Sequence, residues 1–185
     1  MANHAVLIPS AVQAKDIDSL NRFAKAAYDL DNGNVVRLDA KTGTAGEPEV
    51  WAATKPLSAG SLLGGLWMVM EPEIVTIVDA SGNKYRGLND NPQNFYLPTG
   101  QVFTAFQLKL GDLVTLTADA MSNAIASNTF VNAADNTSVL AWGASATSGA
   151  LSMKLIATTT ISIGSGTTLG STGRVSAYQF QVIQI

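Results

Sequence analysis

The chain has 185 residues, of which 46% are hydrophobic and only 14% are charged, and its formal net charge is −3. This length suits one ordinary domain, and the high hydrophobic fraction with few charges excludes a largely disordered chain. There is no cysteine, which excludes disulfides and thiolate chemistry. No lysine and arginine cluster provides the basic face that nucleic-acid binders use, so we expect no nucleic-acid partner.

Residues 1–34 are predicted to form an arm that precedes the main domain. The apolar residues 5–8 stop at Pro9, too early for the core of a signal peptide, and no apolar run approaches the ~20 residues of a membrane span. We therefore expect no membrane partner. Val6, Leu7 and Ile8 lie outside any obvious β core, and exposed apolar clusters usually find a partner. These three residues are the candidate contacts to another protein.

The arm is expected to contain one short helix over residues 16–28. Asp16 is a candidate cap at its start. Apolar residues recur there at helical spacing, at Ile17, Leu20, Ala24 and Ala27. The helix is expected to stop at residues 31–34, whose sequence Asp-Asn-Gly-Asn is typical of a turn.

Residues 35–185 are predicted to form a single β-rich domain. Short runs of valine, isoleucine, threonine and aromatic residues alternate there with glycine, proline, asparagine or serine clusters. The candidate strands are residues 35–39, 50–54, 66–70, 74–79, 84–88, 102–110, 113–118, 139–142, 153–163 and 174–185. This number of short strands predicts a mainly β fold, an antiparallel barrel or sandwich.

Period-two alternation is strongest in residues 153–163. One face of this strand is expected to carry Met153, Leu155, Ala157, Ile161 and Ile163. The final strand places Tyr178, Phe180 and Val182 on one face, and then Ile183 and Ile185 on the other. This switch predicts either a bulge or a strand covered on both faces.

Two turns are predicted to join neighbouring strands into hairpins. Residues 79–82, with the sequence Asp-Ala-Ser-Gly, form the first. The second is Gly111-Asp112, between strands 102–110 and 113–118. Apolar residues there oppose each other only if the loop has three residues or the strand bulges.

No motif predicts an enzyme, a metal site or a bound cofactor. His4 is the only histidine, and a general base in a floppy arm is a poor candidate for catalysis. The glycine after Asp29 stands one position early for a calcium loop, and Ala40 stands where that loop needs a bidentate glutamate. The carboxylates of Glu47/Glu49 and Glu71/Glu73 suit a glycosidase pair only if folding places them in one cleft.

Aromatic residues leave carbohydrate binding open as an alternative. Trp51 and Trp67 lie inside apolar strands, which favours core packing, whereas Trp142 precedes Gly143 and is a candidate for exposure. A row of exposed rings could stack on sugars. The aromatic residues considered are Trp51, Trp67, Trp142, Tyr85, Tyr96 and Tyr178.

Segments spread over most of the chain resemble those of small structural proteins of tailed bacteriophages, which serve as capsid decoration, cement or head-fibre-like proteins. The likeness is one of order and spacing. It rests on residues 5–10 (AVLIPS), 32–38 (NGNVVRL), 49–56 (EVWAATKP), 66–69 (LWMV), 85–88 (YRGL), 100–106 (GQVFTAF), 111–112 (GD) and 174–178 (RVSAY).

The resemblance implies a structural virion protein, made in the host cytoplasm, that decorates and stabilises the outer surface of a capsid. Its expected partners are the major capsid protein and further copies of itself, with a trimer as one candidate oligomer. No catalytic residue, metal or cofactor is expected. Val6, Leu7 and Ile8 are the expected capsid contacts. The alternative is a carbohydrate-binding or tail- or fibre-associated phage protein.

Overall fold

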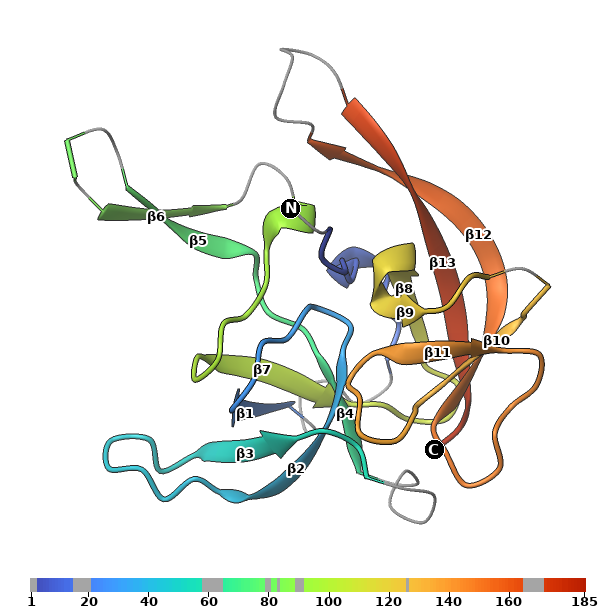
Figure 1. Ribbon diagram of the computed structural model, residues 1–185, viewed down its shortest axis with the longest axis horizontal. Helices are drawn as coiled ribbons and strands as arrows, with labels where there is room; N and C mark the ends of the chain where they lie inside the picture. Colours follow the sequence, from blue (N-terminus) through green and yellow to red (C-terminus); the bar gives the residue numbers. More distant parts are fainter. Residues whose placement is uncertain are drawn as a thin grey trace.

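A computed structural model describes residues 3–14, 21–57, 65–78, 81–82, 84–88, 92–125, 127–164 and 172–185. The fold is mainly β, with about 50% strand and 6% helix, in two curled sheets (Figure 1). Helical structure among the described residues is limited to the short 3-10 turns η1 (Pro9–Ala11), η2 (Pro92–Asn94) and η3 (Ala118–Ala120). The predicted fold class is confirmed.

The first sheet closes into a five-stranded barrel in the order β1-β3-β2-β4-β7. Its strands are β1 (Asn21–Ala26), β2 (Val35–Lys41), β3 (Val50–Thr54), β4 (Leu66–Val69) and β7 (Val102–Gln107). β1 pairs with β3 in parallel and with β7 in antiparallel orientation, which closes the ring.

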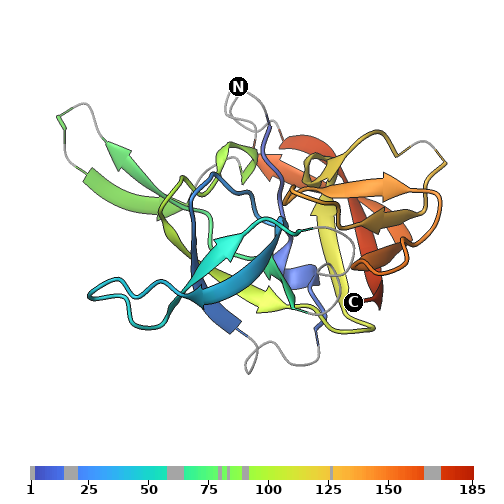
Figure 2. The same ribbon diagram turned by 60° about the horizontal axis from the view of Figure 1, so that its bottom comes forward.

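The second sheet has six strands in the order β8-β13-β12-β10-β11-β9. They are β8 (Leu113–Thr117), β9 (Met121–Ser122), β10 (Phe130–Asn132), β11 (Leu140–Gly143), β12 (Ser152–Gly164) and β13 (Thr172–Gln184). A separate hairpin of β5 (Ile74–Val78) and β6 (Lys84–Leu88) projects from the body in Figures 1 and 2, as predicted for the turn at residues 79–82.

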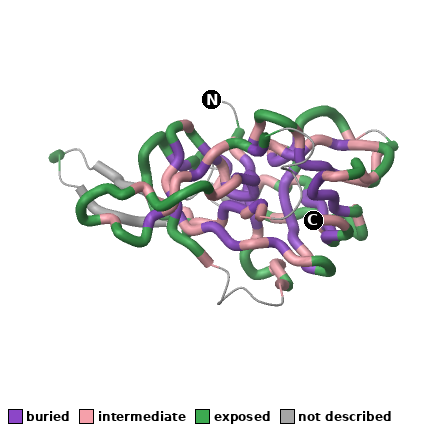
Figure 3. The backbone as a smooth tube through the Cα atoms, turned by 90° about the horizontal axis from the view of Figure 1, so that it is seen from below, coloured by how far each residue is buried: buried purple, intermediate pink, exposed green. Residues whose placement is uncertain are grey.

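Two hydrophobic cores share the strands of the barrel. The barrel interior holds one alternate set of side chains, among them Val36, Val69 and Phe103. The other set, including Met68 and Phe106, packs outside the barrel against the six-stranded sheet. β4, most of β7 and the first two residues of β2 are therefore buried on both faces, whereas the far end of β2 is exposed. Figure 3 shows the resulting band of buried positions through the middle of the molecule.

The helix predicted over residues 16–28 is wrong where the structure tests it, because residues 21–26 form strand β1. Ala24 and Ala26 face the barrel core at alternate positions, and the strand is paired along both edges. This pairing overrides the helical preference of a run rich in alanine, lysine and arginine. Ile17, Leu20 and the capping candidate Asp16 lie outside the described residues. The predicted turn is present, with Gly33 at φ 86°.

The N-terminal segment is part of the fold rather than a free arm. Residues 6–13 run antiparallel to β8, through the bonds Ile8 N–H to Thr115 O (3.0 Å) and Thr117 N–H to Val6 O (3.0 Å). Val6 and Leu7 are only 4% and 1% exposed, and Leu7 belongs to the core between the sheets. The expectation that Val6, Leu7 and Ile8 lie outside the β core is wrong for Val6 and Leu7, and Ile8 is half-buried.

The predicted hairpin at Gly111-Asp112 is also wrong. β7 pairs with β1 and β4 in the barrel, whereas β8 pairs with β13 in the other sheet. The turn instead carries the chain from one sheet to the other. It is held there by the bonds Gly111 N–H to Val182 O and Val182 N–H to Asp112 O, both 2.9 Å.

A bulge at Ile156 changes the predicted face of β12. Leu155 lies opposite Phe180 and Ala157 opposite Gln179, so Ile156 is the extra residue. Met153 and Leu155 therefore face the core, whereas Ala157, Ile161 and Ile163 lie on the opposite face of the hairpin. A second register shift places Ser152 opposite Gln184 and Met153 opposite Val182. This shift leaves Ile183 as an extra residue in β13. The bulge, one of the two alternatives predicted for the final strand, is therefore present.

Replacing Leu7 with alanine is expected to destabilise the fold by about 2–5 kcal/mol, because it removes a fully buried side chain and leaves a cavity. The measurement is the free energy of unfolding in urea. Leu110→Ala is the matched control, because Leu110 is 56% exposed, and it should cost less than about 0.5 kcal/mol. Equal effects of the two substitutions would contradict the placement of the N-terminal segment.

Candidate functional site

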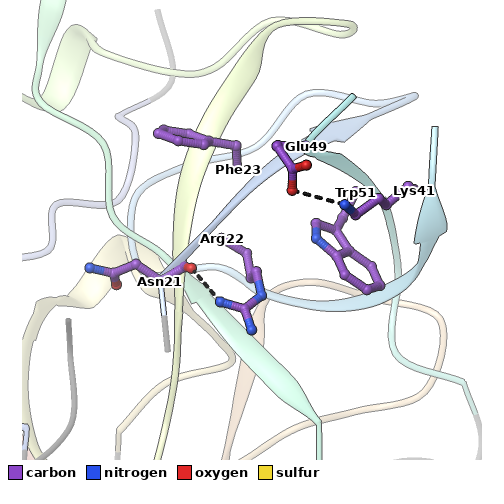
Figure 4. A pocket seen from close by; sticks show the side chains of 6 residues that line it. All are labelled: Asn21, Arg22, Phe23, Lys41, Glu49 and Trp51. Carbon is purple, nitrogen blue, oxygen red and sulfur yellow. Dashed lines mark hydrogen bonds and ion pairs between the residues drawn. The ribbon is translucent and has the colours of Figure 1, made fainter. Parts of the chain in front are cut away.

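A pocket lies at one mouth of the barrel, where β1, β3 and β4 begin and β2 and β7 end. Register places these strand ends together, because Asn21 lies opposite Phe106, Trp51 opposite Lys41, and Trp67 opposite Gln107. The pocket has a volume of about 410 Å³ and is open to solvent. Its lining residues are Asn21, Arg22, Phe23, Lys41, Glu49 and Trp51 (Figure 4).

Arg22 supplies a guanidinium that has no carboxylate partner among the described residues. It lies 5.7 Å from the centre of the Trp67 ring, a cation–π contact that holds the side chain in place. One of its nitrogens donates to the backbone oxygen of Asn21 at 2.9 Å. A guanidinium has five N–H donors, so several remain available to a ligand.

Aromatic rings supply the apolar part of the pocket. Trp51 is half-buried and packs against the barrel core, and Figure 4 shows its ring beside the Arg22 side chain. Phe23 is 57% exposed, more than any other large hydrophobic residue in the described part of the chain. The amide oxygen of Asn21 is buried without a hydrogen-bond partner. The pocket thus combines the Trp51 ring surface with the polar groups of Arg22, Lys41 and Glu49.

Two ion pairs flank the pocket and neutralise their own charges. Lys41 and Glu49 join β2 to β3 at 2.8 Å, and Lys25 bonds Glu47 at 3.2 Å. Of the glutamates considered as glycosidase carboxylates, Glu47 and Glu49 therefore have lysine partners, whereas Glu71 accepts the backbone N–H of Thr104 at 2.8 Å. Arg22 is the cation of the pocket lining that no described carboxylate balances, so the pocket favours an anionic ligand.

A second candidate surface is the open edge of β12. β10 pairs only with residues 152–154 of β12, and Leu155 N–H bonds Thr129 O at 2.8 Å. From residue 156 to residue 164, no described strand pairs with this edge. Residues 156–164 contain no charged residue and no proline, two of the devices with which proteins protect such an edge. Figure 1 shows the far ends of β12 and β13 reaching beyond the rest of the sheet.

His4 is fixed in the structure, which corrects the expectation that it lies in a floppy arm. Its Nδ1 is 2.8 Å from Asp31 Oδ1, and its ring stacks on Tyr96 with 4.9 Å between ring centres. Asp31 also accepts the backbone N–H of Ala5 at 3.2 Å. These contacts fasten the N-terminal segment to the turn after β1.

The acidic run at residues 29–33 serves the fold. Asp29 accepts both the backbone N–H and the hydroxyl of Thr99, bonds that lower the pKa of the Asp29 carboxyl. Asn32 exchanges two hydrogen bonds with the backbone of Glu71. Within the described ranges, no three histidine or acidic residues gather as a metal site would require.

Of the three tryptophans, Trp142 is the least exposed, against expectation. It is 7% exposed and packs 5.4 Å from the ring centres of both Tyr178 and Phe180. Trp51 and Trp67 are half-buried at the barrel mouth. The side chain of Tyr85 lies outside the described residues. Trp142 and Tyr178 are buried, so they cannot join the row of exposed rings that the carbohydrate alternative needs. Sequence reasoning missed Arg22 because it placed this residue in a helix.

The described residues contain no helix long and apolar enough to span a membrane. No protein-family model matches the chain, and comparisons with characterised proteins and with solved structures found no significant match.

Replacing Glu73 with glutamine is expected to stabilise the protein more near pH 7 than near pH 3. Burial raises the pKa of the Glu73 carboxyl above its ordinary value, so the folded state favours the protonated form. This contribution to stability is fully present below the unfolded pKa and is lost as the pH rises through the folded pKa. Glutamine removes that loss.

Urea unfolding of the wild type and of Glu73→Gln at both pH values measures the difference. Glu49→Gln is the control, because the Glu49 side chain is 74% exposed and an exposed ion pair contributes little to stability. A difference between Glu73→Gln and the wild type that does not change with pH would contradict the burial of Glu73.

Proposed function

We propose that the chain is a structural virion protein that decorates and stabilises the outer surface of a bacteriophage capsid by binding the major capsid protein. The observation that carries this proposal is the uncharged, unpaired edge of β12 over residues 156–164. An open edge presents backbone donors and acceptors to an extended segment of another protein. The resemblance to tailed-phage structural proteins names the partner.

On one side of the β12–β13 hairpin the sheet ends at β8, and on the other side β12 itself is unpaired beyond its contact with β10. These two edges differ in how they are covered. The N-terminal segment covers β8 through Leu7 and Gln13, which form bridges to Leu116 and Leu113. The N-terminal segment thus pairs with β8, so this edge is not available to a strand of another protein. No described strand covers the β12 edge over residues 156–164, although the short turn η2 contacts β12 and Ile163 is buried. We therefore assign attachment to β12 and no longer to Val6, Leu7 and Ile8.

The β12 edge has the composition of a strand acceptor. Six of its nine residues are isoleucine or threonine, which favour extended backbone. Each hydrogen bond of an added strand contributes about 0.5–1.5 kcal/mol, while ordering the incoming segment costs about 1–2 kcal/mol per residue. One edge alone therefore binds weakly.

Several copies acting together would overcome this weakness. A homo-oligomer, with a trimer as the proposed form, would present several β12 edges at once, with avidity gains of about 10²–10⁴ over a single edge. The β5–β6 hairpin offers a means of self-association, because it pairs with no other strand in the described part of the chain. Ile74 at its base is 41% exposed.

Placing two lysines on the β12 edge is expected to abolish capsid binding and to leave the fold intact. Thr158 and Thr160 are exposed, so Thr158→Lys with Thr160→Lys disturbs no core residue. Charged side chains on an edge discourage the addition of a strand. The measurement is occupancy on capsids that lack this protein, by co-sedimentation, with an expected loss of about tenfold or more, the factor that about 1.4 kcal/mol represents.

The control carries the same two added charges away from this edge. Thr44→Lys with Ser148→Lys places them in exposed loops and should bind capsids as the wild type does. Circular dichroism and thermal melting check that both variants fold. Full decoration by the Thr158→Lys, Thr160→Lys variant, or equal loss in the control, would overturn attachment through β12.

A further inference from the structure

We propose that the pocket at the barrel mouth binds an acidic saccharide, with its carboxylate on Arg22 and its sugar ring against Trp51. This inference stands on the pocket alone and does not depend on capsid decoration. Barrel mouths are a common position for ligand sites, and the volume of about 410 Å³ falls within the usual range of about 300–1,000 Å³ for small-molecule pockets.

The guanidinium determines the charge of the ligand. Arg22 is positioned by the Trp67 ring and by one backbone oxygen, neither of which neutralises its charge. Elsewhere on the barrel, Arg37 is paired with Asp39 at 2.6 Å. A planar guanidinium binds a carboxylate through two parallel hydrogen bonds. The guanidinium of Arg22 is thus held in position and can bind the carboxylate of a ligand, since no carboxylate in the described part of the chain pairs with it.

The remaining groups determine the rest of the ligand. Trp51, whose ring lies beside Arg22 in Figure 4, offers a ring surface to the apolar face of a sugar. Lys41 and Glu49 provide both donors and acceptors at the rim, as the hydroxyls of a sugar require. A hexuronic acid or a sialic acid carries the carboxylate, the hydroxyls and the ring in one unit.

The position of the pocket leaves it free when the protein is attached to a capsid. In Figures 1 and 2 the barrel strands β1 and β3 lie toward one end of the molecule, and β12 lies toward the other. Attachment through β12 would therefore leave the barrel strands at the end of the molecule away from the contact. Glycans of a host surface could reach the pocket there.

The test is a binding titration of the full-length protein with oligosaccharides that contain glucuronic acid or sialic acid. Each is compared with the same oligosaccharide in which the carboxylate is reduced to a neutral alcohol. Tryptophan fluorescence and saturation-transfer NMR report binding. The acidic forms should bind about tenfold or more tightly than the neutral ones, because a charge-assisted bidentate pair is lost on reduction.

Variants then locate the site. Arg22→Gln should weaken binding of the acidic form about tenfold and reduce the preference over the neutral form, and Arg22→Lys should restore only part of it, since lysine lacks the planar fork. Trp51→Leu should weaken both forms, because the stacking ring is lost. Arg37→Gln and Leu110→Ser are the matched controls, an arginine and an exposed apolar residue away from the pocket, and should bind as the wild type does.

Equal affinity for acidic and neutral forms, or no binding of either, would overturn the proposal. So would equal loss in Arg37→Gln and Arg22→Gln. Uridine diphosphate is included because a nucleobase also stacks on aromatic rings and its phosphates also pair with arginine. If it binds and the acidic saccharides do not, the pocket is a nucleotide site and the saccharide proposal is wrong. The wild-type comparison of acidic and neutral sugars decides the matter even if a variant fails to fold.

Discussion

Burial of β4, β7 and the start of β2 on both faces is the constraint on which the rest of the structure depends. β2, β4 and β7 send alternate side chains into the barrel and into the core against the six-stranded sheet. The two sheets cannot separate without exposing Met68, Phe106 and the aromatic cluster around Trp142. Because the two sheets pack against this shared core, the chain passes from one sheet to the other at Gly111-Asp112. Leu7 of the N-terminal segment is buried in the same core.

The shared core also decides which surfaces remain for partners. The N-terminal segment is used to complete the core and to cover β8, so it is not available as an attachment arm. The far half of the β12–β13 hairpin extends past the point where β10 and β8 pair with it, which leaves an open edge. The barrel mouth carries Arg22 over Trp67. A protein that binds a shell at one end and presents a pocket at the other is consistent with this division.

Most strands could be predicted from the sequence because β-branched and aromatic runs between turn residues depend on local chemistry. Residues 50–54 and 84–88 are strands with the predicted bounds. β1 could not be predicted, since its alanines alternate toward a barrel that forms only through pairing with β3 and β7. The sheet crossing at Gly111 and the bulge at Ile156 depend on distant strands as well. The barrel-mouth pocket was missed for the same reason, because it unites residues of β1, β2 and β3.

Hydrogen exchange of the protein bound to capsids, compared with the free protein, tests the central claim most directly. Backbone N–H groups that bond an added strand exchange more slowly. The account predicts new protection in residues 156–164, with little change in the N-terminal segment, whose bonds to β8 already exist in the free protein. Unchanged exchange over residues 156–164, with new protection confined to the barrel or to residues 3–14, would contradict attachment through β12.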